Sequence, residues 1–234
     1  MKYRAMVSGL LSSILLGVGV AQAPDGNWLS VSLRNLCVTE GVVDQANGDR
    51  LSVTVPKMRA YINAWTSQAI EVHFTYLGPT NSESALGSGE MRRQFGLKLH
   101  AQDPCNLIYA MWRIDPESKL VVSVKRNLNA HTSAECGNRG YENVKPSSAS
   151  ALPRLKPGDS HTLRAEMKKK ELKIFIDDHE VWKGIIEKEA AELHGPVGIR
   201  SDNARLEFEL KAGSYEGAHP NYLKACQTGA ADSD

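Results

Sequence analysis

The sequence has 234 residues, with 28 lysines and arginines against 27 aspartates and glutamates, which gives a formal net charge of +1 at pH 7. This balance argues against nucleic acid or an anionic membrane surface as a partner, because both are bound through strongly basic surfaces. Without the apolar N-terminal segment, roughly 210 residues remain, which is enough for one domain with a sizeable core.

The first residues have the three-part pattern of a secretory signal peptide. Lys2 and Arg4 form a basic start, residues 7–20 form an apolar run, and residues 21–23 supply small side chains for cleavage. Cleavage at 21 is favoured over cleavage at 23, which would leave Pro24 at the new N-terminus. An apolar run of roughly 14 residues is shorter than the ~20 that span a bilayer. We therefore predict export to the periplasm or the cell exterior, with no membrane insertion after cleavage.

Short segments with apolar residues at every second position recur along the remaining chain. This period is typical of half-buried antiparallel strands, and turn-forming clusters such as residues 78–81 separate the segments. The expected strands, in chain order, are Trp28–Leu33, Leu51–Val55, Ile70–Leu77, Gln94–His100, Asn106–Ile114, Leu120–Arg126, His161–Met167, Leu172–Asp177, Glu180–Ile186, Val197–Arg200 and Arg205–Leu210.

Only two segments, Met58–Ser67 and Glu187–Leu193, are expected to be helical. Many short strands without alternating long helices favour an all-β antiparallel sandwich of two sheets, with one or two short helical turns. No composition shift indicates a second domain. We therefore predict a signal peptide over residues 1–21, a single domain over residues 24–227 and a flexible tail over residues 228–234.

Four cysteines in an exported chain predict two disulfides, for which three pairings exist. If Asn106–Ile114 and Leu120–Arg126 form a hairpin, Cys136 lies a short loop beyond the residue opposite Cys105. This geometry favours a Cys105–Cys136 bond and leaves Cys37 to pair with Cys226. The sequence has no Cys-x-x-Cys motif and no adjacent Cys/His pair, so no metal site is predicted from the cysteines.

The passages LKIFIDDHEVWKG (residues 172–184) and GPVGIRSDNARLEFEL (residues 195–210) resemble the closing strands of concanavalin A-like lectin/glucanase jelly rolls. The segment Ala64–Gly78 is similar to the entry strand of the same superfamily. The resemblance implies a two-sheet jelly roll. It does not imply one activity, because this fold hosts lectins, other binding modules, glycosidases and lyases.

Catalytic signatures of that superfamily are missing. Its laminarinase-like glycosidases carry Glu-x-Asp-x-Glu on one strand, which places the carboxylates on one face. The sequence has no such spacing. Glu207 and Glu209 lie two residues apart but have no third partner, so we interpret them as a structural rim. The signatures of alginate-lyase jelly rolls are also absent.

A polar surface for a sugar or uronate is one hypothesis for the outward-facing residues of two strands. By alternation, Glu71 and His73 point away from the core on one strand, and Lys98 and His100 do so on another. If these strands pair on a concave sheet, the four side chains share one surface. The alternative is an ordinary solvated sheet face.

Residues 106–113 are apolar on both faces of their strand, which is unusual for a sheet with one wet side. Either another segment covers the second face, or the strand presents an aromatic platform on which a sugar ring stacks. For the second case, Trp112 and Arg113 are the preferred ligand-binding pair. Lys125 is expected on the outward face of the neighbouring strand.

The loop around Cys136 contains His131 and Glu135, which would form an acid–base pair if they approach each other. A plain connecting loop is the alternative. Together with His73, these are the only candidates for catalysis, and none is assigned a catalytic role. Residues 201–203 supply oxygens for a structural Ca²⁺, although a tight turn explains them better. No other cofactor is predicted.

The sequence therefore favours an exported, non-catalytic jelly roll that binds a polysaccharide or oligosaccharide or another polar ligand. A glycoside hydrolase or polysaccharide lyase with an unfamiliar His/Glu/Lys site in the groove is the first alternative. An envelope structural or adhesion protein is the second, and an exposed apolar patch in place of a polar groove would favour it.

Overall fold

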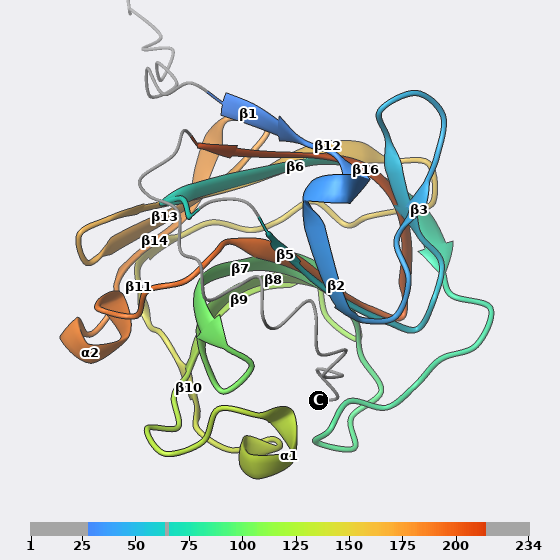
Figure 1. Ribbon diagram of the computed structural model, residues 1–234. Coiled ribbons are helices and arrows are strands. Elements are labelled where there is room, and N and C mark those ends of the chain that lie inside the picture. The colour runs from blue at the N-terminus through green and yellow to red at the C-terminus, as the bar shows by residue number, and fades with distance from the viewer. Residues whose placement is uncertain (1–27, 64–65, 214–234) are drawn as a thin grey trace, which may run out of the picture.

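The computed structural model describes residues 28–63 and 66–213 (Figure 1). The expected signal peptide, the expected tail, Cys226 and residues 64 and 65 of the expected entry strand lie outside the described residues. The predicted limits of the domain therefore stay predictions.

Two antiparallel sheets stack face to face, as the alternating pattern predicts (Figure 1). The larger sheet has nine strands in the order β11-β14-β13-β12-β6-β16-β4-β3, and β1 also pairs with β16. Its strands are β1 (Trp28–Val31), β3 (Asp44–Gln45), β4 (Leu51–Val53), β6 (Ala69–Pro79), β11 (Pro146–Ala149), β12 (Ser160–Lys168), β13 (Glu171–Ile176), β14 (His179–Ile185) and β16 (Ala204–Gly213).

The smaller sheet has seven strands in the order β10-β9-β8-β7-β15-β5-β2. These strands are β2 (Leu36–Glu40), β5 (Lys57–Ile62), β7 (Arg93–Asp103), β8 (Asn106–Asp115), β9 (Lys119–Lys125), β10 (Tyr141–Asn143) and β15 (Gly198–Asp202). In Figure 1, β10 and α1 (Ser133–Cys136) lie on the side of this sheet that faces away from the nine-stranded sheet. The outer face of the seven-stranded sheet is the face that carries the candidate site.

The core lies between the two sheets and is built from alternate residues of their strands. Its centre is aromatic: the ring centroids of Phe74 and Phe95 are 4.4 Å apart, and Trp112 meets Phe74 edge-on at 5.7 Å. All three side chains are completely buried. Burying such a ring contributes roughly 1.5–3 kcal/mol, so this layer holds the sheets in register.

One expected helix is wrong. Residues 57–62 form strand β5, which lies between β2 and β15, although Met58–Ser67 was expected to be helical. Met58, Ala60 and Ile62 face the core, while Tyr61 belongs to a separate apolar cluster on the outer face. Residues 57–62 do alternate, with Lys57, Arg59 and Tyr61 between the core residues, but the alternating segment is only six residues long. The other expected helix is confirmed as α2 (Lys188–Ala191).

Several short elements lack a sequence signal, namely β2, β3, β10, β11, the 3₁₀ turn at Leu33–Asn35 and α1. Both α-helices in the described residues have four residues, so neither is long enough to cross a bilayer.

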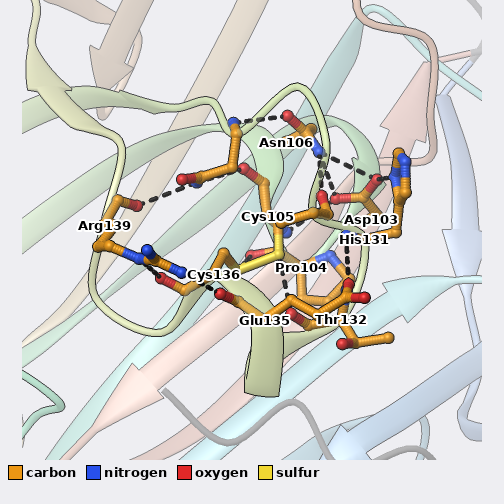
Figure 2. The surroundings of a disulfide bond; sticks show 11 residues. Asp103, Pro104, Cys105, Asn106, His131, Thr132, Glu135, Cys136 and Arg139 are labelled. Atoms are coloured by element: carbon orange, nitrogen blue, oxygen red, sulfur yellow. Dashed lines mark hydrogen bonds and ion pairs between the residues drawn. A yellow bond between two sulfur atoms is a disulfide. The ribbon is translucent and has the colours of Figure 1, made fainter.

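The predicted Cys105–Cys136 disulfide is confirmed, with the two Cα atoms 5.8 Å apart. It ties α1 to the start of β8, as Figure 2 shows. Cys37 is buried on β2. Since Cys226 lies outside the described residues, the predicted Cys37–Cys226 bond stays a prediction.

Candidate ligand-binding site

The predicted pairing of the strands that carry Glu71, His73, Lys98 and His100 is wrong. Strand β6 pairs with β12 and β16 in the nine-stranded sheet, whereas β7 pairs with β8 and β15 in the seven-stranded sheet. Glu71 and His73 therefore lie on the outer face of one sheet, and Lys98 lies on the outer face of the other. The chain between β6 and β7 crosses from one sheet to the other, and strand alternation cannot reveal such a crossing.

Glu71 and His100 also have separate local environments. Glu71 lies beside Arg164, with 3.5 Å between Oε2 and Nη1. His100 is buried, and its Nε2 lies 2.7 Å from Oε1 of Gln68. Burial and the neighbouring His194 lower the pKa of His100, so the ring is neutral near pH 7. No surface unites the four, and the hypothesis of a shared sugar-binding surface loses its geometric basis.

Trp112 does not form an exposed platform. Its ring is completely buried in the aromatic core, so the alternative of a covered face holds for this residue. The alternation places Ile108, Ala110 and Trp112 between the sheets and leaves Tyr109, Met111 and Arg113 on the outer face. The expected pairing of Trp112 with Arg113 as joint ligand anchors is therefore wrong, because the two side chains lie on opposite faces of β8.

Lys98 and Lys125 are on the outer face of the seven-stranded sheet, but both are completely buried. The Lys98 ammonium lies 4.0 Å from the centroid of the Tyr61 ring, and that of Lys125 lies 5.1 Å from the Tyr141 ring. Such cation–π contacts stabilise a desolvated ammonium by roughly 2 kcal/mol. This geometry gives both lysines a packing role and removes them from direct access by a ligand.

Arg113, one of the predicted ligand residues, lines an open pocket. The pocket has a volume of about 200 Å³ and lies on the outer face of the seven-stranded sheet. Strands β7, β8, β9, β10 and β15 form its floor, and the loop before β7 forms part of its rim. Its lining consists of Leu86, Gly87, Ser88, Glu90, Arg92, Gln94, Tyr109, Met111, Arg113, Val121, Ser123, Asn138, Tyr141, Asn143 and Arg200.

Two tyrosines give this pocket an aromatic side. The rings of Tyr109 on β8 and Tyr141 on β10 stack with their centroids 6.0 Å apart and their planes 26° from parallel. Tyr109 is buried, whereas Tyr141 is 37% exposed. The buried ring supports the exposed one, so Tyr141 is held as a rigid apolar surface at the pocket wall.

A buried ionic network supports the opposite side of the pocket. The Asp202 carboxylate accepts hydrogen bonds from Arg59 Nη2 at 2.7 Å, Gln94 Nε2 at 2.7 Å and Arg200 Nε at 2.9 Å. Burial alone would raise the pKa of Asp202, but the two guanidinium groups and Gln94 outweigh it and hold the pKa well below 3.8. Arg200 also lies 5.2 Å from the Tyr109 ring, so the network and the aromatic pair are in contact.

The same network argues against the structural Ca²⁺ considered for residues 201–203. The Asp202 carboxylate is already neutralised by Arg59 and Arg200, whose positive charges would repel a cation. The Asn203 side chain bonds the backbone of Ser84 and Arg92, and its φ of 56° is that of a tight turn. Within residues 28–63 and 66–213, no cluster of three His, Cys, Asp or Glu side chains has a geometry suited to a metal ion.

Two further cavities adjoin the pocket. One of about 320 Å³ shares Glu90, Arg92 and Arg113 with it. The other, of about 710 Å³, shares Tyr141 and Asn143 with it. Because they share lining side chains, the three cavities are neighbours that extend from the outer face of the seven-stranded sheet past its edge strand β10 toward α2. We call these three cavities the outer-face groove.

The predicted His131–Glu135 pair does not form an acid–base site. Glu135 Oε2 instead accepts hydrogen bonds from the backbone N–H groups of His131 and Thr132, at 2.8 and 2.9 Å, and so caps the start of α1. These bonds lower the pKa of Glu135. His131 Nδ1 lies 2.8 Å from Asp103 Oδ2, which raises the pKa of His131 through the hydrogen bond and the opposite charge. Figure 2 shows this arrangement beside the disulfide.

Four residues of the pocket lining were not proposed as site residues from the sequence, namely Arg92, Gln94, Tyr141 and Arg200. For Arg200 a signal was present, since alternation about the core residue Ile199 places it outward. For Tyr141 there was none, because β10 has three residues, all exposed.

Comparison with known proteins identifies the fold. No family model matches the chain, and no curated protein sequence matches it. Among solved structures, the carbohydrate-binding module CBM66 from Bacillus subtilis aligns with a TM-score of 0.51 at 13% identity, covering 74% of this chain and 91% of that one. The carbohydrate recognition domain of Emp46p aligns with a TM-score of 0.49 at 13% identity, over 80% of this chain and 90% of the other.

A putative glycosyl hydrolase from Parabacteroides distasonis aligns with a TM-score of 0.49 at 12% identity, over 80% of this chain and 99% of that one. The alignment with CBM66 shows the fold, and an identity of 13% does not transfer an activity. The fold of this chain is that of the concanavalin A-like lectin/glucanase jelly rolls, as the closing strands at residues 172–210 indicated.

Proposed function

We propose that this protein is an exported, non-catalytic carbohydrate-binding domain, with its ligand in the outer-face groove. One observation carries the proposal: the partly exposed ring of Tyr141, stacked on buried Tyr109, stands beside polar side chains in a group of neighbouring cavities. The C–H face of a pyranose stacks on an aromatic ring, while amides and guanidinium groups bind the hydroxyls at its edge. Tyr141 supplies the ring, and Gln94, Asn138 and Asn143 supply the amides.

The shape of the groove favours an oligosaccharide over a single sugar. The central pocket of about 200 Å³ is small, but cavities of about 320 and 710 Å³ continue it on either side. A chain of sugars lying across Tyr141 and Arg113 would reach both neighbours.

A binding role is favoured over hydrolysis because the central pocket lacks a pair of carboxyl groups, while Glu117, Glu142, Glu187 and Glu189 line only the neighbouring cavities. Glycosidases of the usual mechanisms need two carboxyl groups on either side of the scissile bond. Among the described residues that line the central pocket, Glu90 is the only carboxylate, and it is paired with Arg92. The candidates His73 and His131 do not line this pocket.

Export is supported by the apolar N-terminal segment of the sequence and by the Cys105–Cys136 disulfide. Disulfides of this kind persist in oxidising compartments such as the periplasm and the cell exterior. A carbohydrate ligand outside the cytoplasm agrees with both.

The test is affinity electrophoresis against a panel of neutral and acidic polysaccharides, with Tyr141→Ala as the site variant. The matched control is Phe175→Ala, which removes a half-buried ring from the outer face of the nine-stranded sheet. We expect at least one polysaccharide to retard the wild type and the control equally, and Tyr141→Ala to lose most of that retardation. If Tyr141→Ala binds as the wild type does, the glycan does not bind at the outer-face groove. If no glycan binds the wild type, the proposed function is wrong.

Binding of another protein is a second candidate function, favoured by one observation. The largest cavity of the groove is flanked by Leu128 and Ile185, which are 68% and 57% exposed. Exposed apolar side chains at a cavity are typical of protein-binding surfaces. A Leu128→Ser/Ile185→Ser variant that loses an envelope partner while keeping glycan retardation would support this function beside the first.

A further inference from the structure

Arg113 differs from the other cations of the central pocket and of the adjoining cavity of about 320 Å³ in having no counter-ion among the described residues. Arg92 pairs with Glu90, Arg200 Nε lies 2.9 Å from Asp202 Oδ2, and Lys119 Nζ lies 2.5 Å from Glu117 Oε2. Within the described residues, no carboxylate lies in ion-pair contact with Arg113. Its buried Nε also has no hydrogen-bond acceptor there.

The position is unfavourable for an unpaired cation. Arg113 is half-buried at the end of β8, and burial lowers its pKa, as does the nearby positive charge of Arg92. Glu90 and Glu117 offset this only in part, and each of them already has another partner. A guanidinium stays protonated under these conditions, so the pocket holds one uncompensated positive charge. Buried charges without partners are costly and occur most often at functional sites.

We propose that Arg113 binds a negatively charged substituent of the glycan, a carboxylate or a sulfate group, in the central pocket of the outer-face groove. This inference rests on the proposed carbohydrate-binding function and specifies the class of ligand. A planar guanidinium offers two parallel N–H donors that match the two oxygens of a carboxylate or sulfate. The anionic group of the ligand would take the place of the counter-ion that Arg113 lacks in the central pocket.

The location of Arg113 is suitable for reading a substituent on a sugar chain. It lines both the central pocket and the neighbouring cavity of about 320 Å³, so it lies at the junction of two subsites. Tyr141 lines the same pocket and would stack on the ring that carries the substituent. The other two cations of the central pocket, Arg92 and Arg200, already have carboxylate partners. One anionic group on the bound sugar is therefore enough to neutralise the charge of Arg113.

The experiment measures the dissociation constants of oligosaccharides matched in backbone and differing in charge. One pair is a uronate oligomer and its carboxyl-reduced neutral form, and a second pair is a sulfated oligomer and its desulfated form. Polyglutamate serves as a polyanion without sugar. The variants are Arg113→Gln, which removes the charge, Arg113→Lys, which keeps the charge without the bidentate fork, and Arg50→Gln. Arg50 lies beside Glu207 and Glu209 in the nine-stranded sheet, so its variant changes the net charge equally without touching the groove.

We expect the wild type and Arg50→Gln to bind one acidic oligomer at least tenfold tighter than its neutral form, and to bind polyglutamate weakly. The pair that shows the preference identifies the anion as carboxylate or sulfate. Arg113→Gln should bind the acidic oligomer about 10- to 100-fold more weakly, as expected for the loss of a charge-assisted hydrogen-bond pair, and should lose much less affinity for the neutral form, so that the preference for the acidic form disappears. Arg113→Lys should fall between them.

Equal affinity of the wild type for acidic and neutral forms would overturn this inference and leave the proposed function standing. Retention of the acidic preference in Arg113→Gln would also overturn it. Binding to no oligomer would reject the proposed function and the inference together. A structural role of Arg113 is tested by thermal unfolding: since Arg113 has no ion pair to lose, Arg113→Gln should unfold at or above the wild-type temperature, and a marked decrease would contradict the argument.

Discussion

Replacing Asp202 by Asn tests whether the buried ionic network supports the central pocket. Asp202 is completely buried and is the shared acceptor of Arg59, Arg200 and Gln94. The amide keeps the size of the side chain but removes its charge. Among the described residues, Arg59, which is also completely buried, then keeps one carboxylate, Glu40, whose Oε2 lies 3.7 Å from its Nε, and two backbone carbonyl acceptors.

The expected loss is large because one partner of a buried charge pair is removed. Such changes cost about 3–5 kcal/mol, since the remaining charge stays buried without compensation. For a protein of this size, 1 kcal/mol corresponds to a shift of roughly 2–4 °C in Tm, so we expect Asp202→Asn to unfold roughly 6–20 °C below the wild type. The matched control is Asp115→Asn, which breaks a contact of 3.3 Å between Arg93 and a carboxylate that is 57% exposed. Exposed pairs contribute about 0–1 kcal/mol, so the control should shift Tm by at most a few degrees.

The pH dependence provides a second readout of the same network. The pKa of Asp202 is lower in the folded protein than its ordinary value of 3.8, so ionisation of this group stabilises the fold above pH 3.8. As the pH falls below 3.8, the unfolded state binds the proton first and this contribution decreases. The difference in unfolding free energy between the wild type and Asp202→Asn should therefore be constant near neutral pH and shrink in acid. Urea unfolding followed by tryptophan fluorescence measures it, and a difference below 1 kcal/mol at pH 7 would refute the network's role.

Three further predictions concern the disulfide, the histidine beside it and the core tryptophan. Replacing Cys105 and Cys136 by Ala opens a loop with a sequence separation of 31 residues and should cost ~3–4 kcal/mol in urea unfolding; an unchanged midpoint would contradict a stabilising role. In an NMR titration, the pKa of His131 should lie above 6.5 and should decrease in Asp103→Asn, and a value that does not respond to Asp103 would show that their contact is absent in solution. Trp112→Ala should lower the free energy of unfolding by about 3–5 kcal/mol, because the ring is completely buried. A variant with wild-type stability that loses only glycan binding would instead support the hypothesis that Trp112 is an exposed sugar-stacking residue.

The sequence predicted the fold class because strand alternation is a local property. Segments with one apolar face, such as β6 with Ile70, Val72 and Phe74, were placed correctly. Strand β5 was not, because its alternation covers only six residues, Lys57–Ile62, and was read together with the following residues as one helical segment. The polar three-residue strand β10 has no apolar residue facing the core, so nothing in the sequence marked it.

The site was harder to predict than the fold, because it depends on which strands are neighbours. Alternation correctly gave Glu71 and Lys98 an outward direction, but it could not show that β6 and β7 belong to different sheets. For β8, the face that carries Trp112 was proposed to contact a ligand, but it is the face that packs in the core. Arg113 stays a candidate site residue because its side of β8 lines the pocket together with residues of β9, β10 and the loop before β7.

Mapping a bound oligosaccharide by NMR tests the central claim most directly. Titration of the ¹⁵N-labelled protein with the glycan that binds tightest should shift amide signals of β8, β9, β10 and residues 86–92, which surround the central pocket. Shifts confined to the nine-stranded sheet, or spread over both sheets without a centre near Tyr141, would contradict the account.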